Sequence, residues 1–217
     1  FTAQARMVEE FIDVLGVDQV DLVTNDSGGA IGQILAARAP DRLRTLTLTN
    51  CDVHDNWPPP LVAPMLEACR QGTFGLLVQQ MLNDPSLARS PLALGACYGD
   101  PSKLTRETLA VYLTPLVADE ARIANLHRYF LAFDCRQTVE IEAALQRLRV
   151  PTLVVWGAAD VFFGVEWAAW RASTIPGITK VVMVPGGRLF FTEEEPELLA
   201  RLLRELWSDN PERVDTA

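Results

Sequence analysis

Histidine and cysteine are scarce in this chain of 217 residues, which has two histidines and four cysteines. The cysteines lie far apart and form no CxxC pair, so the spacing typical of zinc and redox sites is missing. The pattern favours reduced thiols buried as small hydrophobic residues in a cytoplasmic protein. We therefore expect no metal and no other cofactor. The cysteines are Cys51, Cys69, Cys97 and Cys135.

Positive charge and long apolar runs are also lacking. The net charge is −9 at pH 7, whereas a nucleic-acid partner requires a basic face. No apolar run reaches the roughly 18 residues of a membrane-spanning helix, so we expect no membrane partner. The composition, with 49% hydrophobic and 22% charged residues, is that of a soluble globular protein with a sizeable core.

The sequence begins at Phe1 and lacks the basic and apolar regions of a signal peptide. Apolar residues instead recur at helical spacing up to Gly16, as in a helix inside a domain. We therefore expect the sequence to be a piece of a longer protein or a processed product. An upstream segment or a partner chain would then complete the fold.

Two stretches alternate between helical and strand patterns. Residues 1–50 are predicted to form a helix, a strand, a helix and a strand, and this order returns from residue 150 as strand, helix, strand, helix. Such alternation predicts a parallel sheet flanked by helices. The predicted strands are 19–24, 44–49, 151–156 and 180–184, and the predicted helices are 1–16, 30–38, 165–174 and 194–207.

The middle of the chain is different, because residues 51–149 show helical patterns and no strand candidate. We therefore predict an α/β fold whose core is formed by residues 1–50 and 150–217. Residues 51–149 are predicted to form a helical unit inserted into that core. Its expected helices are 61–69, 74–82, 104–113, 121–133 and 139–148.

Reactive groups of a parallel sheet lie at the carboxyl ends of its strands. Three of the four predicted strand ends carry a carboxylate, namely Asp26, Asp52 and Asp160, and Arg188 follows the fourth. No arrangement of metal ligands is visible among them.

The first strand end is the most informative. The strand runs directly into Asn25, Asp26 and Ser27 and then into a helix, which is the context of a nucleophile elbow. Gly28 and Gly29 supply the small side chains that such a tight turn needs. The helix N-terminus behind the turn stabilises negative charge on a nucleophile or an oxyanion.

The stretch LGVDQVDLVTNDSGGAIGQILAARAPDRLRTLTLTN resembles the nucleophile strand, helix and following strand of the α/β-hydrolase superfamily. In that register Asp26 falls on the nucleophile, as in haloalkane dehalogenases and epoxide hydrolases, and the Ser27 N–H falls in the oxyanion hole. The resemblance implies that Asp26 attacks carbon to form an ester that water then hydrolyses. It implies a hydrolase for a small apolar haloalkane, epoxide or ester, with residues 51–149 as its cap domain.

Two closing segments extend the resemblance to nearly the whole chain. VVWGAAD resembles the segment with the triad acid, which gives Asp160 that role, and Asp52 is the alternative acid. VPGGRLFFTEEEPELL resembles the segment with the catalytic histidine, but Arg188 stands in its place. Arginine stays protonated and cannot act as a general base. We expect Arg188 to lower the pKa of Asp26 and of Asp160, and turnover to be slow or absent.

Other departures from the family leave alternatives open. Ser27 stands where dehalogenases usually have a halide-binding tryptophan, and the first four strands of the family's eight-stranded sheet are missing. A turn shifted by one residue would make Ser27 the nucleophile. His54 is a candidate replacement base, and His54 and Trp57 are candidate substrate contacts near the start of the helical unit.

Two other functions are compatible with the sequence. A degenerate member of the family would bind a ligand beneath the helices without hydrolysing it. Residues 27–32 also resemble a dinucleotide-binding fingerprint whose first glycine is replaced by Ser27, with Asp52 about where a ribose-binding acid would stand. That interpretation leaves the WGAAD and GGRLFF segments unexplained.

Overall fold

A computed structural model gives the structure of residues 1–211. Its centre is a sheet of four strands in the order β1-β2-β3-β4, and every neighbouring pair is parallel. The predicted α/β fold and all four strands are confirmed, although each strand differs from its prediction by a few residues. The strands are β1 (Val20–Asp26), β2 (Leu43–Cys51), β3 (Thr152–Gly157) and β4 (Ile178–Val184).

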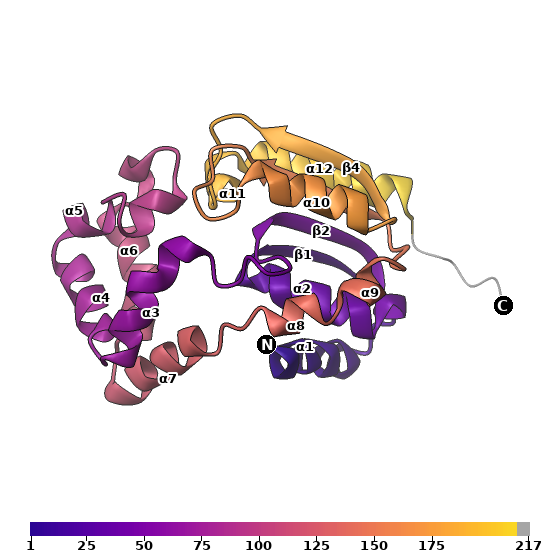
Figure 1. Cartoon of the computed structure of the whole chain (residues 1–217). Coiled ribbons are helices and arrows are strands. Elements are labelled where there is room, and N and C mark those ends of the chain that lie inside the picture. Colours follow the sequence, from indigo (N-terminus) through magenta and orange to yellow (C-terminus); the bar gives the residue numbers. More distant parts are fainter. Residues whose placement is uncertain (212–217) are drawn as a thin grey trace.

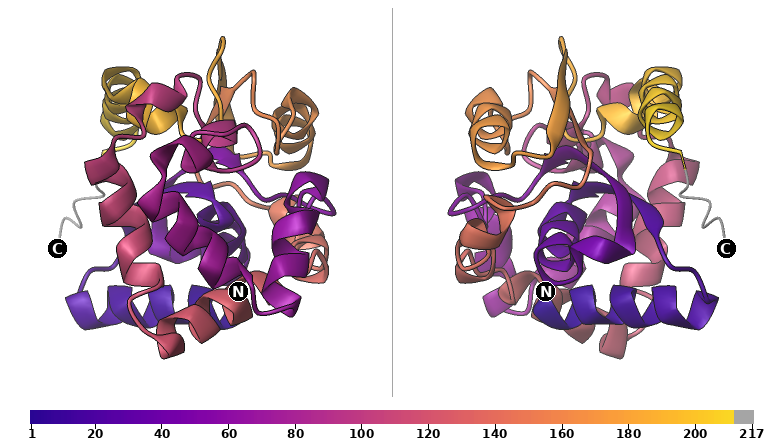
Figure 2. Two further views of the ribbon diagram at one scale, coloured as in Figure 1. Left: turned by 90° about the vertical axis from the view of Figure 1, so that its left-hand side faces the viewer. Right: turned by 90° about the vertical axis from the view of Figure 1, so that its right-hand side faces the viewer.

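Helices cover both faces of the sheet. α2 (Ser27–Arg38) and α10 (Val165–Thr174) pack on one face, and α12 (Pro196–Asp209) packs on the other. Figure 2 shows α10 and α12 on either side of the strands. The wholly buried strand β3 serves both cores, because successive side chains of a strand point to opposite faces. Val154 and Trp156 belong to the first core, and Leu153 and Val155 to the second.

A helical segment, residues 60–145, connects β2 to β3. Figure 1 shows its helices α3 to α7 gathered to one side of the sheet, while α8 and α9 return along the sheet. The segment contains α3 (Ala63–Arg70), α4 (Phe74–Asn83), α5 (Pro85–Ala88), α6 (Arg106–Leu113), α7 (Glu120–Leu131), α8 (Arg136–Val139) and α9 (Glu142–Leu145), and 3-10 turns at Pro60–Val62, Leu94–Cys97, Pro101–Lys103 and Thr114–Leu116. No helix among the described residues is long and apolar enough to cross a membrane.

Three helix predictions need correction. The predicted helix 139–148 is replaced by the short helices α8 and α9, and Thr138 there donates its hydroxyl to two main-chain carbonyls, which competes with regular helix. The predicted helix 194–207 is divided into α11 (Phe191–Glu194) and α12, because Pro196 suits the start of a new helix. The helix predicted from residue 30 begins at Ser27.

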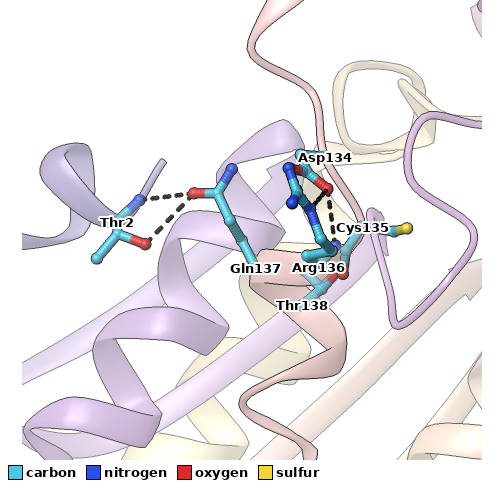
Figure 3. Close-up of polar contacts among 6 residues, drawn as sticks. All are labelled: Thr2, Asp134, Cys135, Arg136, Gln137 and Thr138. Atoms are coloured by element: carbon cyan, nitrogen blue, oxygen red, sulfur yellow. Dashed lines mark hydrogen bonds and ion pairs between the residues drawn. The ribbon is translucent and has the colours of Figure 1, made fainter.

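The start of the chain is tied to the returning segment. In α1 (Thr2–Leu15), the main-chain N–H and the hydroxyl of Thr2 both donate to Gln137 Oε1, at 3.1 and 3.3 Å. Figure 3 shows this contact beside the ion pair between Asp134 and Arg136, the first residue of α8. Because α1 also packs on α2, the returning segment is held near the helix that follows β1.

Glycines in α2 allow the helix to approach the strands closely. A Cβ atom at Gly29 would lie 2.2 Å from Cys51 Sγ, and one at Gly32 would lie 2.5 Å from Thr24 Cγ2. A Cβ at Gly28 would meet nothing within 4 Å. The expectation that the tight turn needs both Gly28 and Gly29 is therefore correct only for Gly29.

This difference gives a matched pair of stability variants. We expect Gly29→Ala to lower the free energy of unfolding by about 1–3 kcal/mol, because the new methyl group must displace Cys51. Gly28→Ala should leave it unchanged or raise it by up to about 1 kcal/mol, because alanine favours helix. Urea unfolding of both variants checks this, and equal stabilities would show that the helix–strand contact is not tight.

Candidate functional site

Asp26 stands at the junction of β1 and α2 in an unusual backbone conformation. Its φ is 52° and its ψ is −134°, which residues with a side chain rarely adopt, and it is the N-cap of α2. Strained junctions of this kind persist only where the surrounding structure imposes them, and they cluster at functional sites. The α2 N-terminus directly follows, so its positive dipole end faces the carboxylate.

Two asparagines tie the strand ends together around Asp26. The Asn25 amide donates to Thr49 Oγ1 at 2.8 Å and to the carbonyl of Leu189 at 3.0 Å. The Asn50 amide accepts from the Gly157 N–H at 2.6 Å and donates to the Gly157 carbonyl at 3.1 Å. The ends of β1, β2 and β3 and the loop after β4 thus form one fixed framework. Sequence analysis did not single out either asparagine.

Asp160 follows β3 and has one engaged and one free carboxylate oxygen. Its Oδ1 accepts the N–H of Phe162 at 2.8 Å and of Phe163 at 3.3 Å, while its buried Oδ2 has no partner among the described residues. Burial raises its pKa to about 6, against the lowering effects of these two N–H groups, of Asn50 and of the Arg188 charge. Asp160 is therefore poised to titrate just below neutral pH.

Asp26 also has a raised pKa, and Asp160 is one reason for it. Burial and then the charge of Asp160 raise the pKa of Asp26 to about 6, and the Ser27 N–H partly opposes the rise. Arg188 does lower the pKa of Asp160, as expected, but burial outweighs it, and Arg188 is not among the groups that shift the pKa of Asp26. The Arg188 guanidinium donates to the Ala96 carbonyl at 3.3 Å.

Asp52 is brought next to Asp26, as the sequence predicted for strand ends. Its N–H donates to the Asp26 carbonyl at 3.3 Å, and its side chain is 1% exposed. Burial and the charge of Asp26 raise its pKa well above the ordinary value, although Arg171 opposes them. Gln33 and Arg171 each donate to the Asp52 carbonyl at 2.8 Å. Burial thus favours the protonated form of Asp52, and Gln33 and Arg171 hold its main chain in place.

The helical segment reaches the site through Tyr129 of α7, which sequence analysis missed. Its hydroxyl lies 2.5 Å from Ser27 Oγ, and burial raises the pKa of this phenol, so it remains protonated. Trp57 is nearly fully buried in an aromatic cluster around Phe1, whose ring centroid lies 4.6 Å from that of Trp57, 5.2 Å from that of Tyr129 and 5.5 Å from that of Phe133. Helical periodicity alone could not orient Tyr129 toward a residue 102 positions earlier.

The histidines make their polar contacts elsewhere. His54 has Nε2 3.0 Å from Glu142 and Nδ1 3.2 Å from Asp55, and its ring packs on Trp170. The structure therefore gives no support to His54 as a replacement base for Asp26. His127 Nε2 accepts the N–H of Gly75 at 3.3 Å within the helical segment.

A cysteine lies close to the carboxylates. Cys97 is buried, and the charges of Asp26 and Asp160 add to burial in raising the pKa of its thiol, so it stays protonated. The Cys97 carbonyl accepts the N–H of Phe190 at 2.9 Å, which joins the helical segment to the loop after β4. No group of three or more potential ligands within residues 1–211 is placed to hold a metal ion.

Two surface hollows lie away from these carboxylates. One runs along α12, and the other, of about 550 Å³, lies near the amino ends of the strands between Gln19, Arg44 and Arg147. Chemistry in a parallel sheet belongs to the opposite, carboxyl end. We therefore take the Asp26 region as the candidate site.

The fold agrees with comparison to known proteins. Residues 1–195 match the α/β hydrolase fold family, so the chain belongs to that family. The crystal structure of an α/β hydrolase fold protein from Burkholderia ambifaria has the same fold, with a TM-score of 0.77 and 19% identity over 92% of this chain and 70% of that chain.

Curated relatives include different enzymes. A 2-hydroxy-6-oxononadienedioate/2-hydroxy-6-oxononatrienedioate hydrolase of Paraburkholderia phymatum is 27% identical over 73% of this chain and 52% of its own length. Haloalkane dehalogenase 2 of Mycobacterium bovis is 26% identical over 93% of this chain and 68% of its own length. This chain therefore spans about half of the first relative and two thirds of the second.

The raised pKa of Asp26 predicts that the difference in stability between the wild type and Asp26→Asn depends on pH. Since its pKa rises from 3.8 to about 6 on folding, the folded state binds more protons than the unfolded state between these values. Burial of Asp26 therefore costs stability as pH rises from about 4 to about 6, by on the order of 2–3 kcal/mol. Asp26→Asn should melt at a higher temperature than the wild type at pH 7, and this difference should vanish near pH 4.

Thermal melts between pH 4 and pH 7.5 check this expectation. Asp18→Asn, at an exposed position outside the site, is the control and should follow the wild type throughout. A constant difference between Asp26→Asn and the wild type at all pH values would contradict the raised pKa.

Proposed function

We propose that this chain provides the chemistry of an α/β-hydrolase with an aspartate nucleophile. The observation that carries the proposal is the strained placement of Asp26 between β1 and the N-terminus of α2. An anion held there faces main-chain N–H groups and a helix dipole, which favour charge on the nucleophile and on the oxyanion of an ester intermediate. The Ser27 N–H, which already acts on the Asp26 carboxylate, is the proposed oxyanion donor.

The proposed substrate is a small, largely apolar molecule whose leaving atom accepts hydrogen bonds. Ser27 and Tyr129 place two hydroxyls next to the nucleophile, and the Tyr129 phenol is protonated. A departing halide or an opening epoxide oxygen would accept a hydrogen bond from such donors. The aromatic cluster of Phe1, Trp57 and Phe133 supplies apolar surface beside them.

Residues 51–149 are proposed to act as a cap domain over this site, with residues 1–50 and 150–217 as the hydrolase core. Tyr129 and Cys97 support this division, because both come from the helical segment and lie near Asp26. The helices would then determine substrate specificity, and the residues at the strand ends would carry out the chemistry. Asp160 would assist Asp26, and Asp52 would be the alternative acid.

Hydrolysis is proposed to be slow, because no histidine accompanies Asp26. Arg188 occupies the position proposed for the family's histidine and cannot take a proton from water. The next residue, Leu189, has no titratable side chain and therefore supplies no base. It is buried, and its carbonyl accepts a hydrogen bond from Asn25. An ester formed on Asp26 would then accumulate.

Replacement of the nucleophile tests the function. We expect peptide mass spectrometry to find an alkyl adduct on Asp26 after incubation with 1-bromohexane or styrene oxide, and no adduct at residue 26 in Asp26→Asn, since an amide is a poor nucleophile. Asp18→Asn, which removes an exposed carboxylate outside the site, should be labelled at Asp26 as in the wild type.

The same experiment separates the alternatives. If neither adduct nor product forms, and a ligand still stabilises both the wild type and Asp26→Asn, the chain binds its ligand without hydrolysing it. Labelling of Ser27 by an ester substrate would shift the nucleophile by one residue. Thermal stabilisation by NAD would instead support the dinucleotide-binding alternative.

We further propose that additional structure, from a longer chain or a partner, covers the β1 side of the sheet. Among residues 1–211, β1 and β4 each have a strand neighbour on one side only, and Val23 of β1 is 41% exposed. The outer face of α1 is also apolar and exposed, notably at Phe11 and Val14. Uncovered strand edges and apolar faces promote association.

This predicts that the 217-residue chain self-associates when produced alone. Val23→Lys should reduce the association, because a charge blocks edge pairing, whereas Val181→Lys on the opposite edge strand β4 should not. Light scattering after gel filtration measures the mass of each variant. A stable monomeric wild type would contradict the proposal.

A further inference from the structure

Hydrolysis of an ester on Asp26 requires a group that removes a proton from water. Both histidines make polar contacts elsewhere, His54 with Glu142 and Asp55, and His127 with Gly75. Arg188 cannot accept a proton. A base must therefore be sought among the acidic side chains at the strand ends.

The protonated groups near Asp26 are unsuitable. Tyr129 and Cys97 have pKa values raised above those of ordinary phenols and thiols, so both hold their protons at neutral pH. Burial also raises the pKa of Asp52, and among residues 1–211 its carboxyl group lacks the main-chain N–H partners that orient Asp160. Asp160 differs, because its pKa of about 6 leaves it ionised at pH 7 and close to the range in which general bases work well.

The geometry of Asp160 suits a proton acceptor. Two main-chain N–H groups hold Oδ1, which fixes the carboxylate, and the buried Oδ2 has no partner among the described residues. The charges that face Asp160 are Asp26 from the end of β1 and Arg188 from the loop after β4, and the Cys97 thiol faces it from the helical segment. The side chain of Asn50 of β2 also lies near Asp160 and lowers its pKa.

We propose that Asp160 itself is the general base that deprotonates the hydrolytic water, and does not merely orient another base. The inference rests on the proposed Asp26 nucleophile. It assigns to one carboxylate the two tasks that a histidine and its acid partner would otherwise share.

The reaction balances with the groups present. Asp26 displaces the leaving group, which departs with its electron pair, and an ester forms. Water then attacks the ester carbonyl carbon while Asp160 Oδ2 takes its proton. The tetrahedral intermediate expels the alkoxide, which takes that proton from Asp160 to become the alcohol. Asp26 is left as a carboxylic acid and loses its proton to solvent.

Single-turnover labelling separates the two chemical steps. The full chain is treated with 1-bromohexane, excess reagent is removed, and the fraction of alkylated Asp26 is followed by peptide mass spectrometry. Asp160→Asn should still form the adduct, because Asn can keep the contacts of Oδ1, but should lose it at least about 100-fold more slowly than the wild type. Asp18→Asn is the control and should match the wild type.

The pH dependence gives a second test that needs no variant. Adduct decay in the wild type should fall about tenfold for each pH unit below about 6, because protonation of Asp160 removes the base. In Asp160→Ala, added formate should restore decay by replacing the missing carboxylate. This test also covers the case in which Asp160→Asn does not fold.

The outcomes distinguish this inference from the proposed function. If the adduct forms and decays at the same rate in Asp160→Asn and in the wild type, Asp160 is not the general base. If the ester on Asp26 persists only in Asp52→Asn, Asp52 is the general base instead. A decay rate independent of pH between 4.5 and 7.5 also contradicts it. Failure of every variant and the wild type to form an adduct overturns the nucleophile itself.

Discussion

The close approach of α2 to the end of β2 is the contact on which the candidate site depends. Gly29 lies against Cys51, and the next residue, Asp52, is fixed through its carbonyl by Gln33 of the same helix. The short turn at Asp26, with its positive φ, lies where this close approach begins. Backbone strain at one residue is thus sustained by many ordinary packing contacts around it.

Burial of several acids in one place sets the electrostatics. Asp26, Asp52 and Asp160 cannot all be charged at low cost, so protonation is divided among them. The pKa of Asp52 is raised well above its ordinary value, and the pKa values of Asp26 and Asp160 are raised to about 6. The fully buried Arg171 is the cation that faces Asp52, and it also lies over the Trp156 ring, 4.8 Å from its centroid. That stacking helps to retain a charge that would otherwise be expensive to bury.

The fold could be predicted well from the sequence because its signals are local. Buried β-branched strands and amphipathic helices are visible in short windows, and the ends of the predicted strands are enough to indicate Asp26, Asp52 and Asp160. What the sequence could not supply depends on long-range packing. Tyr129 meets Ser27 across 102 positions, and Asn25 reaches Leu189 across 164. The net direction of the two pKa shifts could not be predicted for the same reason. The lowering by Arg188 was expected and acts on Asp160, but the larger cost of burial is not visible in the sequence.

The strand ends and the helical segment divide the work of the site. The carboxylates come from junctions fixed by the sheet, whereas Tyr129 and Cys97 come from the helical segment that connects β2 to β3. If that segment is the proposed cap, a change in its helices can alter which molecule fits without moving Asp26 or Asp160. The reverse does not hold, because Asn50 and Asn25 connect the strand ends to one another and to the loop after β4. Substitutions in this framework would disturb Asp26, its acidic neighbours and the contact of the helical segment with the loop after β4 together.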